Sequence, residues 1–300
     1  MANWIRVKPL GQGSYGEVFL AKPTADSLDY FAIKATQLPL HHCSSFSSPL
    51  REKCILECFI GCPEIVQCYG GEIIIMEGDS FDLASFFLIM EYAAGGSLAD
   101  LIKKRKKLAE NEVKDYLRMI LRGVACIHDK GFVHADLKPG NILAFPQPDG
   151  KMKLKITDFG LTRRSCEEEE AYDDYCVERR FRGTPIYMSP ESVYGQVKAP
   201  LDIWSVGCIA VEIVSGKPVW DGCPDQKLML KLVDKMEIPK IPEEFSEEGK
   251  DFVGRCFDLE PERRWTAEML LQHSYLKEEN KDEIQMRFLH GHVNKFRSAI

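Results

Sequence analysis

The first third of the chain alternates between hydrophobic and polar positions with a period of two. Residues 5–10, 17–23 and 29–35 follow this pattern and are rich in β-branched and aromatic side chains, which favour strands. A glycine-rich turn separates the first two segments. Residues 72–77 and 86–92 show similar runs. The pattern therefore predicts a strand at each of these positions.

Helical periodicity dominates the remainder. Residues 49–60 are expected to form a helix between the third and fourth strands. Residues 97–104 and 110–130 place apolar side chains three and four positions apart, as on one face of a helix. Residues 202–216 are apolar nearly all round, which indicates a buried helix. Residues 141–157 instead predict a hairpin around the turn sequence PQPDG. The stripe within 110–130 comprises Leu117, Ile120, Leu121, Val124 and Ile127.

Composition and charge narrow the class of protein. Of the 300 residues, 45% are hydrophobic and 28% are charged, as is usual for a soluble globular protein. The net charge of −7, from 39 basic and 46 acidic side chains, gives no reason to expect nucleic-acid binding as the main function. No apolar run is long enough to span a membrane, and the N-terminus has no apolar signal core. We therefore expect a cytoplasmic protein, with the nucleus as an alternative location.

The chain contains eleven cysteines. Cys54, Cys58 and Cys62 fall four positions apart, so on a helix they would share one face. Their neighbours are apolar and include no histidine. This favours free thiols that are buried as small hydrophobic groups, with a zinc site as the alternative. Because no secretion signal is present, we expect all eleven cysteines to be reduced.

Two runs of like charge are local features of the sequence. Lys103–Lys107 are five consecutive basic residues. We interpret them as the solvated end of a helix, with a docking or localisation patch as the alternative. Residues 167–170 are four consecutive glutamates inside a longer acidic stretch.

Glycines near the N-terminus indicate a phosphate-binding flap. Gly11, Gly13 and Gly16 form the pattern G-x-G-x-x-G, which is weakly specific by itself because dinucleotide-binding folds also contain it. Here a strand follows the pattern instead of a helix, and this arrangement suits backbone N–H groups that close over phosphates. Lys34 lies within the next apolar strand, where we expect an inward-pointing cation that meets an anion.

Further motifs follow this loop in a fixed order. They resemble the motifs of the eukaryotic protein kinases, and the resemblance covers about residues 4–276. Lys138 and Thr184 are features similar to those of the serine/threonine class. The motifs are AIK at 32–34, HADLKPGN at 134–141, DFG at 158–160 and SPE at 189–191.

The resemblance implies a bilobal α+β fold. Residues 1–92 would form a small lobe with an antiparallel sheet and one main helix, and residues 93–276 a larger, mainly helical lobe. The whole protein kinase domain would span 4–276, followed by a C-terminal tail helix at 277–300. That helix would either pack on the large lobe or dock a partner. Its helical spacing comes from Leu289, Val293, Phe296 and Ile300.

The resemblance also implies the catalytic roles. Phosphoryl transfer depends on positioning and on stabilising a spreading negative charge. Lys34 would hold the α- and β-phosphates of ATP, and Lys138 would steady the γ-phosphate. Asp136 would orient the substrate hydroxyl and accept its proton. Asp158 and Asn141 would bind Mg²⁺, which prefers oxygen ligands.

An apolar slot for adenine is implied as well, since such sites combine apolar walls with a few fixed polar groups. Leu143 would lie beneath the base, and Met90 would be the gatekeeper. Backbone groups of Glu91 and Ala93 would face the adenine edge. The residues expected to contact the nucleotide are Leu10, Gly11, Gly13, Gly16, Val18, Ala32, Lys34, Met90, Glu91, Ala93 and Leu143.

Four residues would support the site structurally. The phosphate-binding lysine would pair with a glutamate of the small-lobe helix, for which Glu52 is favoured and Glu57 is the alternative. Glu191 would pair with Arg264. Asp202 would brace the backbone of the catalytic loop.

The segments GGSLADLI, GTPIYMSPE and RWTAEMLLQHSYL resemble the kinase kinase kinases of mitogen-activated protein (MAP) kinase cascades, particularly the plant members with short chains. This resemblance implies a protein substrate, a MAP kinase kinase, phosphorylated with ATP and Mg²⁺. The alternative is a pseudokinase that binds nucleotide and partners without efficient catalysis. Pseudokinases typically lack one of four residues, and all four are present here, which favours an active enzyme: Lys34, Asp136, Asn141 and Asp158.

Ala135 occupies the position at which many kinases carry an arginine. That arginine meets a phosphate on the activation segment, and alanine offers neither a donor nor a charge. Between Ser165 and Glu178 the segment contains seven acidic residues, with five arginines on its flanks. We hypothesise that these charges order the segment among themselves and leave substantial basal activity. A disordered acidic loop is the alternative, and Ser165 and Thr184 are the two residues assigned to the activation segment.

Overall fold

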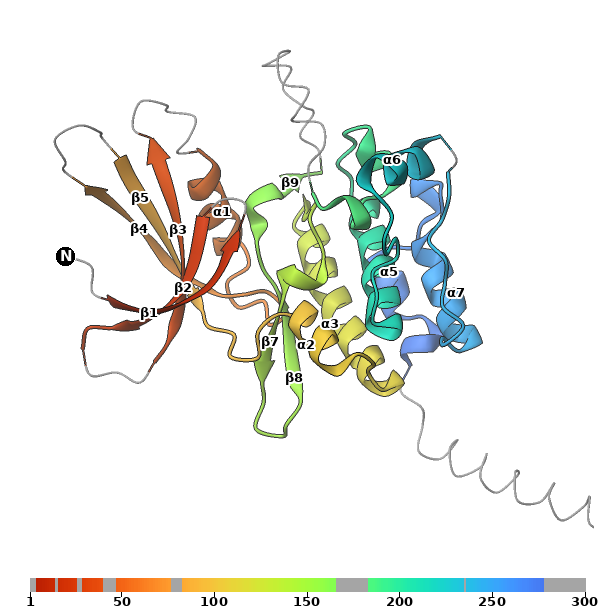
Figure 1. The fold of residues 1–300 in the computed structure, drawn as a ribbon, viewed down its shortest axis with the longest axis horizontal. Coiled ribbons are helices and arrows are strands. Elements are labelled where there is room, and N and C mark those ends of the chain that lie inside the picture. Colours follow the sequence, from red (N-terminus) through yellow and green to blue (C-terminus); the bar gives the residue numbers. More distant parts are fainter. Residues whose placement is uncertain are drawn as a thin grey trace, which may run out of the picture.

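Two lobes, joined by a short connector (residues 91–97), make up the protein in the computed structural model (Figure 1). The small lobe contains a sheet and one helix, and the large lobe is mainly helical. The predicted α+β bilobal fold is therefore confirmed. The structure describes residues 4–13, 16–25, 29–39, 47–76, 83–165, 183–234 and 236–277.

The small lobe is built on one antiparallel sheet with the strand order β1–β2–β3–β5–β4. Each strand overlaps a segment in which hydrophobic alternation predicted one. Phe19 and Ile33 are buried on one face of the sheet, where Trp4 and Phe87 pack against them. The strands are β1 (Trp4–Gly13), β2 (Gly16–Pro23), β3 (Phe31–Pro39), β4 (Cys68–Met76) and β5 (Leu83–Glu91).

The large lobe surrounds a buried helix, α5 (Pro200–Ser215). Its side chains are almost all buried, as the apolar sequence predicted. It packs on α3 (Glu110–Asp129), whose predicted apolar stripe is buried too. No helix in the described ranges is long and apolar enough to cross a membrane. The other helices are α2 (Leu98–Arg105), α4 (Pro190–Val193), α6 (Asp225–Val233), α7 (Glu247–Cys256) and α8 (Ala267–Leu271).

The predicted hairpin lies where the two lobes meet (Figure 1). Its strands, β7 (Ile142–Pro146) and β8 (Met152–Ile156), are antiparallel. The connector is bound to this hairpin, because Gly95 N–H donates to the Ala144 carbonyl (3.0 Å) and Ala144 N–H donates to the Gly96 carbonyl (2.8 Å). Two short strands, β6 (Phe132–Val133) and β9 (Arg163–Arg164), form a separate antiparallel pair.

Helix α1 (Ser47–Glu57) ends before the predicted boundary at residue 60. The chain then turns away to bind the hairpin, and Val66 N–H donates to the Ile156 carbonyl (2.9 Å). Cys54 and Cys58 are exposed. The expectation that thiols in this segment are buried on one helical face is therefore wrong at these two positions.

A disulfide joins Cys62 to Cys126 of α3. The expectation that all eleven cysteines are reduced is therefore wrong for this pair. The bond connects the loop after α1 to the large lobe. The same loop is bound to β8, because Ile156 N–H donates to the Glu64 carbonyl (2.8 Å). The small-lobe helix is thus followed directly by a segment anchored on the large lobe.

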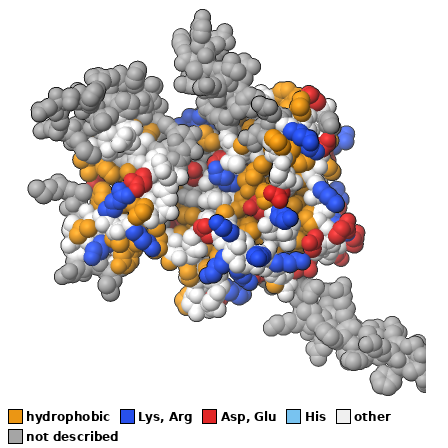
Figure 2. Space-filling model, viewed as in Figure 1, with side chains coloured by type: hydrophobic (Ala, Val, Ile, Leu, Met, Phe, Trp, Pro, Cys, Tyr) orange, Lys and Arg blue, Asp and Glu red, His pale blue; other side chains and the backbone are white. Residues whose placement is uncertain are grey.

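The basic run Lys103–Lys107 lies at the end of α2 and in the loop after it. All five side chains are exposed, and Arg105 forms a salt bridge with Glu112 of α3. Figure 2 shows basic side chains gathered along the lower part of the large lobe, with acidic side chains interspersed elsewhere. This exposure agrees with the solvated end of a helix.

Most of the predicted tail helix, from residue 278 onward, lies outside the described residues. The last described segment is fixed on the large lobe, because Arg118 Nε donates to the Leu276 carbonyl (2.7 Å). Packing of the tail on the large lobe and docking of a partner through it both stay predictions.

Two helical glycines differ in the space around them and provide a matched test of packing. A Cβ on Gly207 in α5 would lie 2.7 Å from Cβ of Cys256 and 2.8 Å from a ring carbon of Phe257, whereas the position on Gly254 in α7 is open. We expect Gly207→Ala to lower the free energy of unfolding by about 1–3 kcal/mol through overpacking. We expect Gly254→Ala to raise it by about 0.5–1 kcal/mol through helix propensity. Urea denaturation measures both, and equal changes would contradict this packing.

Candidate functional site

Lys34 joins elements of both lobes. It projects from β3, and its Nζ donates to both carboxylate oxygens of Glu52 on α1 (2.9 and 2.8 Å). The same Nζ donates to Oδ1 of Asp158, which follows β8 (2.8 Å). Of the two glutamates that the sequence left open, Glu52 is therefore the partner of Lys34. Glu57 pairs instead with Lys53, one turn earlier on the same helix.

Burial and charge act in opposite directions on this cluster. Burial would lower the pKa of the Lys34 ammonium, but Glu52 and Asp158 raise that pKa above its usual value. Burial would raise the pKa of Asp158, but the charge and hydrogen bond of Lys34 hold it below its usual value. Lys34 and Asp158 are consequently both ionised at neutral pH. The cluster presents a cation held in a fixed position by carboxylates.

Asp202, a buried carboxylate on α5, holds the backbone of the expected catalytic loop (residues 134–141). Its Oδ2 accepts a hydrogen bond from His134 N–H (2.9 Å), and its Oδ1 accepts one from Ala135 N–H (3.0 Å). Nε2 of His128 on α3 lies 2.9 Å from Oδ2. Ala135 has a φ of 65°, in a region that costs a non-glycine residue about 1–2 kcal/mol. The hydrogen bonds to Asp202 hold this strained conformation in place.

Three donors converge on the carboxylate of Asp136. Lys138 Nζ and Asn141 Nδ2 donate to its Oδ2 (2.8 and 3.0 Å). Thr184 Oγ1 donates to its Oδ1 (3.0 Å) and accepts a hydrogen bond from Lys138 Nζ (2.8 Å). Asp136 is thereby oriented, and the catalytic loop is connected to the segment that leads into α4.

Asn141 and Asp158 offer oxygen ligands to a divalent cation. Asn141 Nδ2 donates to the carbonyl and the carboxylate of Asp136 (2.8 and 3.0 Å), which leaves its Oδ1 available. The side chain of Asp158 is 33% exposed, although Lys34 occupies one carboxylate oxygen. An amide oxygen and a partly exposed carboxylate are donors of the kind that Mg²⁺ prefers, so these residues fit the predicted metal site.

Aromatic contacts connect the cluster at Lys34 to the catalytic loop. The ring of Phe159 lies 5.3 Å from that of Phe59 and 5.0 Å from that of His134, measured between centroids. All three side chains are buried. Phe59 lies just after α1, so its contact with Phe159 fixes the end of α1 against the DFG segment. Phe159 in turn contacts His134 of the catalytic loop.

The residues expected around adenine lie on neighbouring strands. Ala32 of β3 is the cross-strand partner of Met90 of β5, and both are buried. Leu10 of β1 is 39% exposed, and Leu143 of β7 is partly buried, so apolar surface stays accessible to a ligand. The other expected side chains, Val18, Glu91 and Ala93, are partly buried.

The glycine-rich loop closes the hairpin of β1 and β2. Gly13 and Gly16 are the last cross-strand pair, and Gly11 pairs with Val18 before them. Gly16 has a φ of 150°, and a Cβ at this position would collide with the carbonyl oxygen of Ala35. Glycine is therefore required at position 16 by backbone conformation and by the approach of β3.

The two ends of the activation segment, near Ser165 and near Glu191, differ in burial. Arg264 forms a bidentate salt bridge with Glu191 (2.6 and 3.2 Å) and donates to the Pro200 and Asp258 carbonyls (2.7 and 3.1 Å). The expected pair is therefore present, fully buried on the arginine side. Ser165, at the other end, is exposed.

Some residues that position the site belong to none of the motifs. His128 lies at the end of a helix that the sequence predicted, but nothing in the sequence places it beside Asp202. Gln67 and Lys155 contact the connector residue Glu91. Gln67 lies between the predicted helix and the next predicted strand, and Lys155 lies in the predicted hairpin. Helical and strand periodicity predicts elements, whereas these contacts arise between elements.

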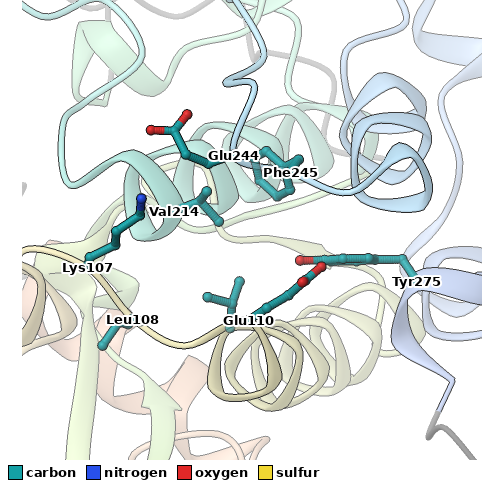
Figure 3. A pocket seen from close by; sticks show the side chains of 8 residues that line it. Lys107, Leu108, Glu110, Val214, Glu244, Phe245 and Tyr275 are labelled. Atoms are coloured by element: carbon teal, nitrogen blue, oxygen red, sulfur yellow. The ribbon is translucent and has the colours of Figure 1, made fainter. Parts of the chain in front are cut away.

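A separate pocket with a volume of about 360 Å³ lies in the large lobe (Figure 3). Val214 and Phe245 line it, and the exposed Lys107 and Glu110 also contribute. The phenol oxygen of Tyr275 points into this space, and no described group forms a hydrogen bond with it. None of the residues expected to bind nucleotide or substrate lines this pocket.

The structure combines three features that define the class of protein kinases. These are two lobes, a lysine paired with a glutamate beneath a glycine-rich hairpin, and an aspartate on the facing loop. The family model described as the protein kinase domain matches residues 4–276. The chain belongs to the protein kinase family.

Comparison with individual proteins narrows the type. The chain is 38% identical over 296 residues to mitogen-activated protein kinase kinase kinase 20 of Arabidopsis thaliana, covering 96% of this chain and 82% of that protein. It is 33% identical over 280 residues to mitogen-activated protein kinase kinase kinase 17 of the same plant, covering 91% and 69%. The chain is 31% identical over 295 residues to the MAP kinase kinase kinase wis4 of Schizosaccharomyces pombe, covering 94% of this chain and 20% of that protein. The predicted enzyme class, a serine/threonine protein kinase resembling plant MAP kinase kinase kinases, is confirmed.

The stability of the fold is expected to depend on pH through Asp202. Burial would raise the pKa of this carboxyl, but His128 and the backbone N–H of His134 hold it below its usual value. A carboxyl with a lowered folded-state pKa stabilises the fold above its unfolded-state pKa of about 4, and this stabilisation is lost as the pH falls below it. Urea denaturation of the wild type at a series of pH values from neutral downward should show this loss.

Asp202→Asn provides the control for this dependence. Its free energy of unfolding should be lower than that of the wild type at neutral pH, and the difference should shrink as the pH falls. Parallel pH curves for the two proteins would show that Asp202 is not the group responsible.

Proposed function

We propose that the chain transfers the γ-phosphate of ATP to a serine or threonine hydroxyl of a protein, and that this protein is a MAP kinase kinase. The observation that carries the proposal is the network at Asp136. A carboxylate oriented by Lys138, Thr184 and Asn141 suits a group that receives a substrate hydroxyl. The charged cluster at Lys34 supports it, since such a cluster suits a polyphosphate.

Asp136 is the proton acceptor in the proposed reaction. The hydroxyl oxygen of the substrate bonds to the γ-phosphorus, and the bond from that phosphorus to the β–γ bridging oxygen breaks, so ADP leaves. The hydroxyl proton passes to the Asp136 carboxylate. Lys138, whose Nζ lies 2.8 Å from Asp136 Oδ2, supplies positive charge beside the reacting oxygen, where negative charge spreads.

Lys34 binds the α- and β-phosphates in this proposal, and Glu52 keeps its ammonium in position. Asn141 and Asp158 would hold Mg²⁺, which when bound neutralises charge on the phosphates. Adenine would enter the slot between Ala32 and Leu143.

The names of the relatives support the proposed substrate. Two Arabidopsis proteins that share 38% and 33% identity with this chain carry the name mitogen-activated protein kinase kinase kinase. An enzyme of that name acts on a MAP kinase kinase. A cytoplasmic or nuclear location, expected from the sequence, stays a prediction.

A pseudokinase is the second candidate, because the same fold can serve binding without chemistry. The complete cluster of Lys34, Glu52 and Asp158 and the oriented Asp136 favour catalysis over this alternative. A pseudokinase would have no need of a proton acceptor hydrogen-bonded to a lysine.

We further propose that catalysis does not require a phosphate on the activation segment. Ala135 has no side-chain donor for such a phosphate, and its backbone is held by Asp202 instead. The C-terminal end of the segment is already fixed through Thr184 and through the Glu191–Arg264 pair. The acidic stretch itself, residues 166–182, lies outside the described residues.

Incubation with ATP, Mg²⁺ and a panel of catalytically inactive MAP kinase kinases tests the proposed reaction and substrate together. We expect phosphate on serine or threonine of at least one panel member, located by mass spectrometry. Asp136→Asn should reduce this transfer by at least about 10³-fold, since it removes the proton acceptor, with the melting temperature little changed. Lys34→Met should have a similar effect. Equal phosphorylation by Asp136→Asn would overturn the assignment.

Phosphatase treatment tests the proposed control. The treated enzyme and the variant with alanine at Ser165, Tyr172 and Tyr175 should keep kcat/KM within about tenfold of the untreated wild type, a difference of at most about 1.4 kcal/mol. A larger loss that is reversed on rephosphorylation would show that the segment needs phosphate despite Ala135. Thr184 is left unchanged because it contacts Asp136.

A further inference from the structure

Glu91 lies where β5 ends and the connector begins, and its side chain is held by several hydrogen bonds. Both carboxylate oxygens accept hydrogen bonds from Lys155 Nζ of β8, each at 2.6 Å. Gln67 N–H also donates to Oε1 of Glu91 (2.7 Å), and Glu91 N–H donates to the Gln67 carbonyl (3.0 Å). The side chains of Lys155 and Glu91 are only 13% and 14% exposed. This ion pair is therefore largely shielded from water, unlike a surface salt bridge that solvent weakens.

Gln67 extends this contact to the loop that follows α1. Its Nε2 donates to the carbonyls of Cys62 (3.0 Å) and Ile65 (2.8 Å), and its Oε1 accepts a hydrogen bond from Gly61 N–H (2.7 Å). The backbone of the connector at Glu91 is consequently fixed between this loop and β8.

Lys155 lies on the face of the hairpin that carries Leu143. The two residues are cross-strand partners in the register of β7 and β8, and directly opposed residues of an antiparallel pair project to the same face. Phe145 shares that face, and Lys155 Nζ lies 4.7 Å from the centroid of its ring. One side chain therefore joins the connector to the strand expected beneath adenine.

We propose that Lys155 is a positioning residue for the adenine of the nucleotide. Its ion pair with Glu91 sets the separation between the connector backbone, which would face the adenine edge, and Leu143, which would lie under the base. Lys155 acts through Glu91 and not by contact with the nucleotide. This inference rests on the proposed use of ATP.

Removal of Lys155 leaves a largely buried carboxylate with one backbone donor. Such a group moves toward water, because an unpaired buried charge is costly, and we expect this movement to shift the end of β5, where Glu91 is the last residue. The adenine slot would change its width. Asp136, Lys34 and Glu52 lie on other elements, and Asp158, which follows β8, is held by Lys34, so we expect binding of the base to weaken while the chemical step is preserved.

The test compares Lys155→Met with Lys155→Arg and Lys153→Met. Arginine keeps a bidentate partner for Glu91. Lys153 lies two positions earlier on β8, opposite Phe145, and forms no salt bridge with any described residue, so its change controls for loss of a lysine from this face. Binding of adenosine and of ADP is measured by competition with a fluorescent nucleotide, and kcat and KM for ATP by phosphate transfer.

We expect Lys155→Met to raise the Kd of adenosine, the Kd of ADP and the KM for ATP by about tenfold each, within the range for an unpaired buried group. An equal factor for adenosine and ADP places the effect at the base and not at the phosphates. The kcat should stay within about twofold of wild type. Lys155→Arg and Lys153→Met should bind adenosine like the wild type.

The double variant Glu91→Gln/Lys155→Met removes both charges. It controls for the possibility that Lys155→Met weakens binding only by destabilising the fold. It should melt close to the wild type and still bind adenosine more weakly. If Lys155→Met binds adenosine as tightly as the wild type, or lowers kcat without affecting KM, the inference is wrong and the proposed function stands. If the wild type binds no adenine nucleotide, both fail.

Discussion

The contact of Lys34 with Glu52 and Asp158 is the interaction on which the rest of the site depends. An ammonium in this buried position needs a partner, because the desolvation of an unpaired ion costs several kcal/mol. Strand β3, helix α1 and the segment after β8 must therefore approach one another together. The same approach packs Phe59 of the α1 loop against Phe159, so the charge contact and the aromatic contact select one arrangement of the lobes.

Asp202 fixes the facing side of the site in a comparable way. Its carboxylate binds the backbone of His134 and Ala135, so the loop is held through main-chain donors that any residue except proline could supply. This explains why alanine is tolerated at position 135. The proposed activity without an activation-segment phosphate rests on this arrangement, because alanine has no side-chain donor for a phosphate, whereas Asp136 is oriented by Lys138 and Thr184. On that proposal, the catalytic geometry does not depend on a phosphate contact at position 135.

Much of the fold could be predicted because strand alternation and apolar helices are local properties of the sequence. The partner of Lys34 needed the structure, since Glu52 and Glu57 lie on the same short helix and differ only in the direction they face. The error at Cys58 came from a helix that ends early to let its loop bind β8. The disulfide at Cys62 and the pair formed by Lys155 were equally hidden, because contacts between distant elements leave no periodic signal.

The buried ion pairs of this protein share a property that apolar contacts lack. The pairs Lys34–Glu52, Lys155–Glu91 and Arg264–Glu191 each join two different elements through two hydrogen bonds at defined distances. An apolar substitute of similar volume could be equally stable, yet it would allow the elements to slide. Phosphoryl transfer requires its groups to be held in line. We therefore interpret these pairs as determinants of position, retained at sites where a small displacement would cost more in rate than in stability.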